Sequence, residues 1–106
     1  MKPIDAAILL DYYGGLLTER QRRVMSLYCD FDLTPSEIAE ELSMTRQAAH
    51  DIVSKCRAML DEYEAKLGLA GRGAALKAEL ERAVRLIESG DIPAAAQKLT
   101  KITESI

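Results

Sequence analysis

The chain has 106 residues, a length that fits one domain with a modest core. Hydrophobic residues make up 48% of the chain and charged residues 29%, an ordinary globular balance. The net charge of −3 argues against a general DNA-binding domain, because phosphate contacts need basic charge. Since Trp is absent and there is only one Phe, we expect an aliphatic core, which favours packed helices over a sheet.

Metal, redox and membrane functions find little support in the sequence. Cys29 and Cys56 have neither the spacing of metal ligands nor a neighbouring cluster of histidines, so we expect two reduced thiols and no cofactor. No stretch approaches the roughly 20 apolar residues that a membrane span requires. The N-terminus lacks the pattern of a secretion signal, so we expect a cytoplasmic protein.

The first two predicted elements are helices. Apolar residues at helical spacing predict a helix over about 3–13, which Gly14 and Gly15 end. A second helix is predicted over 19–29, with Thr18 as its N-cap. In the connector that follows, we expect Phe31 and Leu33 to pack back into the core.

Residues 34–57 have the pattern of two short helices joined by a tight turn, a helix-turn-helix. Thr34 and Glu37 form a capping box around Pro35, which is favoured at the first helical position. Ser43 and Met44 are predicted to form the turn. Thr45 then caps the second helix, whose predicted apolar face consists of Ala48, Ala49, Ile52 and Cys56.

The second helix of this motif is predicted to be unusually long, because its apolar spacing continues to Gly68. The continuing positions are Ile52, Cys56, Met59, Leu60, Tyr63 and Leu67. Such a long apolar face needs a surface to pack on. The sequence leaves two alternatives open: the first helix of the same chain, or a second copy of the chain in a homodimer.

The predicted fold is all-α, with a tri-helical helix-turn-helix core, a long fourth helix and a C-terminal helical hairpin. Three glycines within 68–73 predict a hinge after a helix-turn-helix domain over 1–67. The region 74–106 then contains two predicted helices, 74–89 and 92–104, with Gly90 and Asp91 as caps between them. We expect this hairpin to pack on the same core or on a dimer partner.

The outward side of the second motif helix carries the candidate nucleic-acid contacts. In a helix-turn-helix, the N-terminal residues of the second helix lie nearest the base edges of the major groove. Arg46 matches a guanine and Gln47 an adenine in hydrogen-bonding pattern. The predicted base-reading residues are Arg46, Gln47, His50 and Ser54, and the predicted phosphate contacts are Arg20, Arg22, Arg23, Lys55 and Arg57.

The charge of the motif favours a different interpretation. Residues 34–66 hold four positive and seven negative side chains, and like charge near phosphate weakens binding. The alternative is a structural module that binds a protein partner. Catalysis is less favoured than either, because His50, the one histidine, has no cysteine beside it on its predicted face.

Residues 9–69 contain several linked motifs, which are, in chain order, DYYG, LLTERQ, SEIAEEL, TRQAAHD and YEAKL. Together these motifs resemble the YlxM family of small bacterial helix-turn-helix proteins. The SEIAEEL and TRQAA stretches are also similar to region 4 of sigma factors, a far larger set. His50 departs from the family, since we expect an aromatic residue there, and the tail after Leu69 has no obvious match.

The resemblance implies an all-helical fold with a helix-turn-helix like that of sigma region 4. It also implies a non-enzymatic, regulatory role with the signal recognition particle, because family genes commonly lie beside those for the particle's GTPases. The expected partners are therefore DNA or the particle's RNA, a GTPase of the particle, or both.

Overall fold

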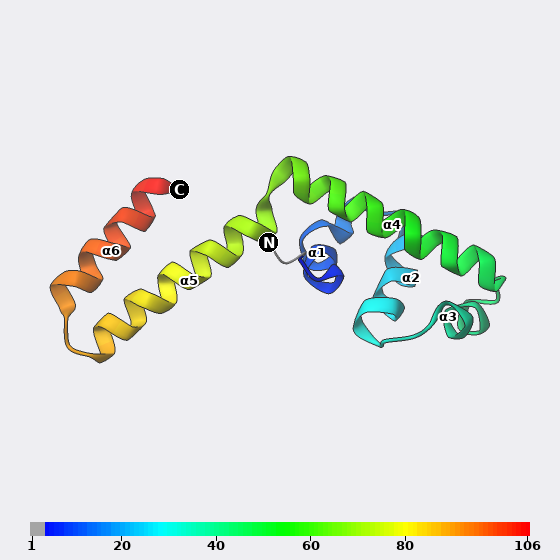
Figure 1. The fold of residues 1–106 in the computed structure, drawn as a ribbon, viewed down its shortest axis with the longest axis horizontal. Coiled ribbons are helices and arrows are strands. Elements are labelled where there is room, and N and C mark those ends of the chain that lie inside the picture. The colour runs from blue at the N-terminus through cyan, green and yellow to red at the C-terminus, as the bar shows by residue number, and fades with distance from the viewer. Residues whose placement is uncertain (1–3) are drawn as a thin grey trace. The chain divides into compact units, whose positions relative to one another are not determined.

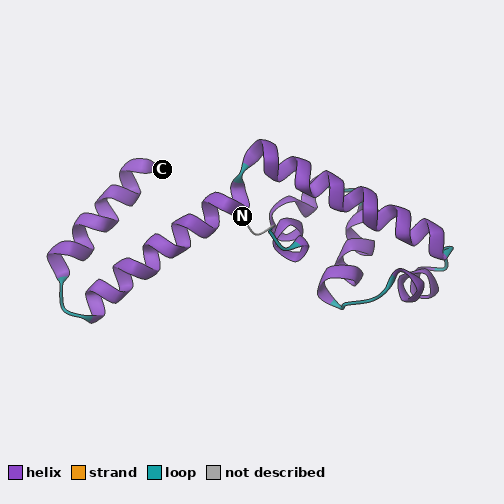
Figure 2. Cartoon of the chain, viewed as in Figure 1, coloured by secondary structure: helices purple, strands orange, loops and turns teal. Residues whose placement is uncertain are grey.

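The computed structural model describes residues 4–106, which form helices joined by short loops (Figure 2). The described residues contain no strand, so the predicted all-α fold is confirmed. The predicted first residue of the first helix, Pro3, lies outside the described residues. The elements are α1 (Ala6–Tyr13), the short 3-10 helix η1 (Gly14–Leu16), α2 (Glu19–Asp30), α3 (Pro35–Leu42), α4 (Arg46–Leu67), α5 (Leu69–Glu88) and α6 (Ile92–Ser105).

The chain divides into two compact units, residues 1–70 and 71–106. In the first unit, α1, α2 and α3 pack along the same side of the long helix α4 (Figure 1). Each of the four helices contributes to one aliphatic core, as expected for a chain without Trp. Its buried members are Leu9, Leu10, Tyr13, Leu17, Val24, Met25, Ile38, Ala39, Ala49, Val53, Cys56, Leu60 and Ala70.

Side-chain caps fix where the helices of this unit begin. The hydroxyl of Thr34 accepts the backbone N–H of Glu37 at 3.2 Å, and the Glu37 carboxylate accepts the Thr34 N–H at 3.0 Å, which completes the predicted capping box. Thr18 forms an equivalent box with Gln21 at the start of α2. The hydroxyl of Thr45 accepts the Ala48 N–H at 3.0 Å, so α4 begins where the sequence predicts.

The turn between α3 and α4 is closed by a left-handed residue. Ser43 has a φ of 54°, and the N–H groups of Ser43 and Met44 both point to the carbonyl of Ala39. Both donors share one carbonyl of the last turn of α3, and the left-handed Ser43 turns the chain sharply into Thr45. The orientation of α4 relative to α3 therefore depends on a short turn with a left-handed residue at Ser43.

The C-terminal half of α4 packs on α1 of the same chain. Leu60 is fully buried, and the rings of Tyr13 and Tyr63 lie 6.0 Å apart between their centroids. The predicted long apolar face of α4 is thus covered within the first unit as far as Tyr63. Leu67, the last predicted member, is half exposed.

The connector after α2 differs from the prediction at one position. Leu33 packs against the core, but Phe31 exposes 68% of its surface. The reason is local: Phe31 ends α2, and Asp32 follows in the left-handed region with a φ of 54°. The chain reverses there and the Leu33 N–H returns to the Leu27 carbonyl, so Leu33 points inward and Phe31 does not.

Helix α5 covers most of the predicted hinge over 68–73. Only Gly68 breaks the helix, with a φ of 64°, and α5 begins at once with Leu69. The first backbone donors of α5 are satisfied by the first unit: the Tyr13 hydroxyl accepts the Leu69 N–H at 3.0 Å, and the Glu64 carboxylate accepts the Ala70 N–H at 3.0 Å. These contacts start the helix, so it tolerates the two further glycines that the sequence suggested would break it.

The second unit consists of the rest of α5 and α6, joined by a tight turn. Gly90 adopts a φ of 86°, and the Asp91 carboxylate accepts the Ala94 N–H at the start of α6, as predicted. Lys98 donates to Glu79 at 2.8 Å and links the two helices. No helix among residues 4–106 is long and apolar enough to cross a membrane.

Candidate nucleic-acid interface

The first turns of α4 present three of the predicted base-reading side chains to solvent. Arg46, Gln47 and His50 are all exposed, because Ala49 and Val53 take the buried side of the same helix. Within the described residues, Arg46 forms no ion pair or hydrogen bond through its guanidinium. Its five N–H donors are therefore available to a ligand.

A surface depression joins these three residues to the start of α3. Its walls are Arg46, Gln47 and His50 on one side, and Thr34, Pro35 and Ser36 on the other. The side chains on these walls include a guanidinium, an amide, an imidazole and a serine hydroxyl, groups that donate to phosphate oxygens and base edges. The contribution of α3 was missed by the sequence analysis, since only the tertiary packing of α3 on α4 brings Ser36 beside His50.

Asp51 is the acidic member of this face. The Gln47 amide donates to its carboxylate at 2.8 Å, and the His50 ring nitrogen Nδ1 lies 3.8 Å from it. The pair with Gln47 holds that amide along the helix surface. A phosphate that approaches this face meets the negative charge of Asp51.

The remaining candidates on α4 divide into two kinds. Ser54 and Lys55 are exposed, so both stay accessible to a ligand. Arg57, a predicted phosphate contact, is only partly exposed, and its guanidinium is already engaged. It donates to Asp61 at 3.1 Å and to the backbone carbonyl of Ile4 at 3.1 Å, which fastens the chain before α1 to α4.

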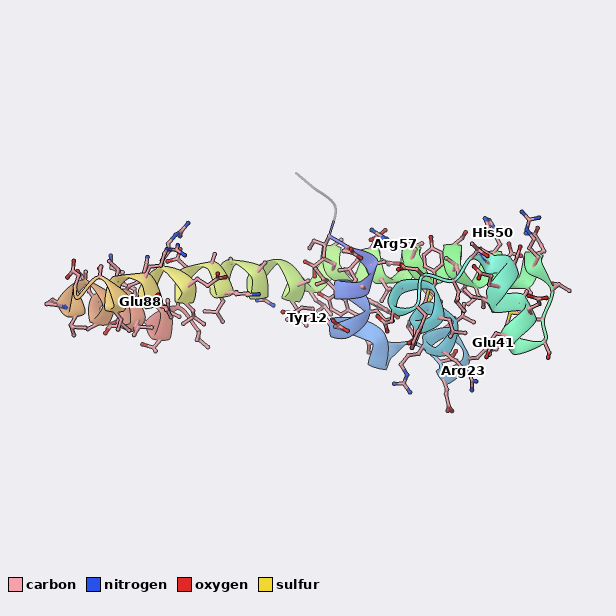
Figure 3. All side chains as sticks on the ribbon, turned by 90° about the horizontal axis from the view of Figure 1, so that it is seen from below. Tyr12, Arg23, Glu41, His50, Arg57 and Glu88 are labelled. Atoms are coloured by element: carbon pink, nitrogen blue, oxygen red, sulfur yellow. The ribbon has the colours of Figure 1, made fainter. Side chains whose placement is uncertain are left out.

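The arginines of α2 lie away from this face. In Figure 3, His50 and Arg57 lie along one edge of the first unit, whereas Arg23 and Glu41 lie along the opposite edge. Arg20 and Arg23 line a separate depression beside the helix-turn-helix turn, which they share with Glu19 and Glu41. Arg22 lies on the same helix and is also exposed. The structure thus brings Arg46, Gln47 and His50 together, and it separates them from Arg23.

Glu37, one of the acidic residues of the motif, caps the start of its own helix. The pKa of Glu37 is lowered, because the Thr34 backbone N–H and hydroxyl stabilise its carboxylate. This carboxylate is held at the helix start and acts as a cap. The carboxylate keeps its negative charge in this position, so the cap does not remove the charge objection to nucleic-acid binding. Glu41, another acidic residue of the motif, lies on the opposite edge from His50.

The two thiols belong to the interior of the first unit. Cys56 is buried in the core and Cys29 is partly buried, and burial raises the pKa of both thiols. Raised pKa values leave little thiolate at neutral pH. Among residues 4–106, no group of three or more His, Cys, Asp or Glu side chains is arranged to hold a metal ion.

The capped α3, the left-handed turn and the exposed start of α4 define a helix-turn-helix protein. The chain belongs to the family described as "Putative helix-turn-helix protein, YlxM / p13 like", which matches residues 1–93. This match extends beyond the 9–69 that the motifs suggested, and it includes all of α5.

Curated relatives support the same membership. A UPF0122 protein of Desulforamulus reducens is 40% identical over 102 residues, covering 93% of this chain and 87% of the relative. A UPF0122 protein of Halalkalibacterium halodurans is 42% identical over 105 residues, covering 99% of this chain and 94% of the relative. One from Clostridium kluyveri is 53% identical over 66 residues, covering 62% of this chain and 60% of the relative.

Proposed function

We propose that this protein is a non-enzymatic, cytoplasmic accessory factor of the signal recognition particle pathway, and that its helix-turn-helix binds DNA or the particle's RNA. The observation that carries the nucleic-acid part is the shared depression of Arg46, Gln47, His50 and Ser36. The link to this pathway is inferred from the resemblance to the YlxM family, whose genes commonly lie beside those for the particle's GTPases.

In this proposal, Arg46 and Gln47 contact base edges, and His50 and Ser54 extend the same exposed face along α4. Lys55 and the start of α3 meet phosphate. At the start of α3, Pro35 has no N–H and the Glu37 N–H donates to Thr34, so the Ser36 hydroxyl is the donor proposed to meet phosphate there. Arg57 serves the fold, and the arginines of α2 contribute only long-range charge.

A second candidate function is favoured by one specific observation, the excess of acidic side chains in residues 34–66. In this alternative, the module binds a basic surface of a signal recognition particle GTPase and contacts no nucleic acid. Depressions that mix both charges, such as the one lined by Arg20, Arg23, Glu19 and Glu41, are suited to polar protein contacts.

Recovery of the tagged protein from cells, with its RNA, DNA and protein partners identified together, distinguishes the two candidates. The nucleic-acid proposal predicts enrichment of a defined RNA or DNA that is lost in Arg46→Ala and retained in Lys66→Ala. Lys66 is a suitable control because it is exposed near the far end of α4 and pairs with Glu62 at 3.0 Å. Enrichment of a GTPase alone, unchanged by Arg46→Ala, contradicts the proposal and favours the alternative.

A homodimer also forms part of the proposal. It gives two copies of α4, as is common for helix-turn-helix proteins that bind repeated half-sites. Light scattering tests the dimer by itself, since each chain has a mass of 11.7 kDa.

A further inference from the structure

The hairpin of α5 and α6 carries a row of large aliphatic side chains that its own packing does not cover. On α5 they recur every three or four residues, which places them on one side of the helix. Six of these side chains expose between 36% and 55% of their surface: Leu76, Leu80, Val84, Ile87, Ile92 and Leu99. We call these six residues the hairpin face.

The interior of the hairpin is small and partly polar. Among residues 71–106, the buried side chains are Ala83, Ala95 and Ile102. The ion pair of Lys98 with Glu79 occupies another position between the helices. An apolar depression remains between the start of α5 and the end of α6, with Leu76 and Ile106 on its walls. The larger side chains are therefore left on the outside.

This unit is below the size at which a separate domain is usually stable by itself. Chains below roughly 40 residues usually need disulfides, metals or oligomerisation, because they bury too little apolar area. Residues 71–106 fall below that length, and they contain no cysteine. An exposed row of large aliphatic side chains of this kind favours an interaction site.

The hairpin face is complementary to itself. In an antiparallel pairing of α5 with its copy, a two-fold axis near residue 82 places Leu76 opposite Ile87 of the partner subunit. The same axis places Leu80 opposite Val84 of the partner subunit. No charged residue lies on the face, so two copies meet without burying like charges.

The charged residues Lys77 and Glu88, which flank the hairpin face, are also complementary about this two-fold axis. Lys77 and Glu88 lie on the same flank of the aliphatic row by helical spacing. The two-fold axis brings Lys77 of each chain next to Glu88 of the partner subunit, which gives two opposite-charge pairs at the rim. In the described residues, neither side chain has an ion-pair partner within its own chain.

We propose that α5 and α6 of two chains pair through the hairpin face into an antiparallel four-helix bundle, which makes the protein a homodimer. This inference supplies the interface for the dimer in the proposed function and rests on that part of it alone. It does not depend on nucleic-acid binding. In an isologous interface of this kind, every contact occurs twice.

Sedimentation equilibrium of the full chain tests the proposal. We expect a mass of twice the 11.7 kDa chain mass at micromolar concentration. Leu80→Glu places a charge in the centre of the face and should produce a monomer. Ala78→Glu places the same charge on the exposed opposite side of α5 and should leave the dimer intact. A monomeric wild type, or a dimer that survives Leu80→Glu, overturns the interface.

A charge swap tests the antiparallel pairing without altering the aliphatic face. Lys77→Glu and Glu88→Lys should each weaken the dimer by at least about tenfold, because each creates two like-charge pairs. The double variant should recover most of the wild-type affinity. Single variants that leave affinity unchanged, or a double variant no tighter than the singles, overturn the pairing. Nucleic-acid binding by the wild type is measured separately, so failure here leaves the helix-turn-helix proposal untouched.

Discussion

The hydroxyl of Tyr13, at the end of α1, accepts the backbone N–H of Leu69, the first residue of α5, at 3.0 Å. The same hydroxyl donates to the Glu64 carboxylate of α4, which in turn accepts the N–H of Ala70. One buried phenol thus connects three helices. It also satisfies a backbone donor that a helix start leaves without an intrahelical partner.

Removing that hydroxyl should destabilise the first unit. Tyr13→Phe keeps the buried ring but leaves the Leu69 N–H and the Glu64 carboxylate each without one partner. We expect a loss of about 1–3 kcal/mol in the free energy of unfolding, measured by urea denaturation. Tyr12→Phe is the matched control, because Tyr12 is the neighbouring residue and is half exposed. Equal effects of the two variants would show that the Tyr13 network adds no stability.

The same network makes stability depend on alkaline pH. Burial raises the pKa of Tyr13 above its ordinary value of 10.0, and its hydrogen bond to the Glu64 carboxylate raises it further. The unfolded chain therefore loses this proton at a lower pH than the folded protein does. The stabilisation is fully present below pH 10 and is lost as pH rises from there through the folded-state pKa.

Thermal melts at a series of pH values between 8 and about 11 test this dependence. The wild type should lose stability more steeply above pH 10 than Tyr13→Phe does, so the difference between the two should shrink as pH rises. A difference that stays constant across the series contradicts the assignment to Tyr13.

The junction between α4 and α5 depends on the left-handed backbone of Gly68. Its φ of 64° is costly for any residue with a Cβ atom, even though the surrounding space is open. Gly68→Ala should reduce the free energy of unfolding by about 1–2 kcal/mol. Gly15→Ala is the control, since that glycine has no positive φ and a Cβ there meets no atom within 4 Å. We expect the control to be neutral or slightly stabilising.

Local signals in the sequence predicted much of this fold. The caps at Thr18, Thr34, Thr45 and Asp91 act within a few residues, so their patterns identify helix starts directly. The end of α4 at Gly68 is likewise a local signal. Features that depend on distant partners were missed. The helical start of α5 requires Tyr13, which lies far away in the sequence.

In the candidate site, too, local features were predicted and features that depend on distant residues were not. Arg46, Gln47 and His50 share one helix, so spacing alone placed them together. The hydrogen bond of Arg57 to the carbonyl of Ile4 was not predicted, because Ile4 belongs to a different part of the chain. The distance between Arg23 and His50 depends on how α2 packs against α4, which no local pattern encodes (Figure 3).

The most direct test of the proposed function is to titrate duplex DNA and the particle's RNA with the protein. Binding is measured by fluorescence anisotropy, at low and at physiological salt. We predict binding that weakens with added salt, because phosphate contacts release counterions. Arg46→Ala should lose about 1–3 kcal/mol of binding free energy, whereas Lys66→Ala should resemble the wild type. Absence of binding to both nucleic acids at low salt, or equal losses in the two variants, would contradict a reading site at the start of α4.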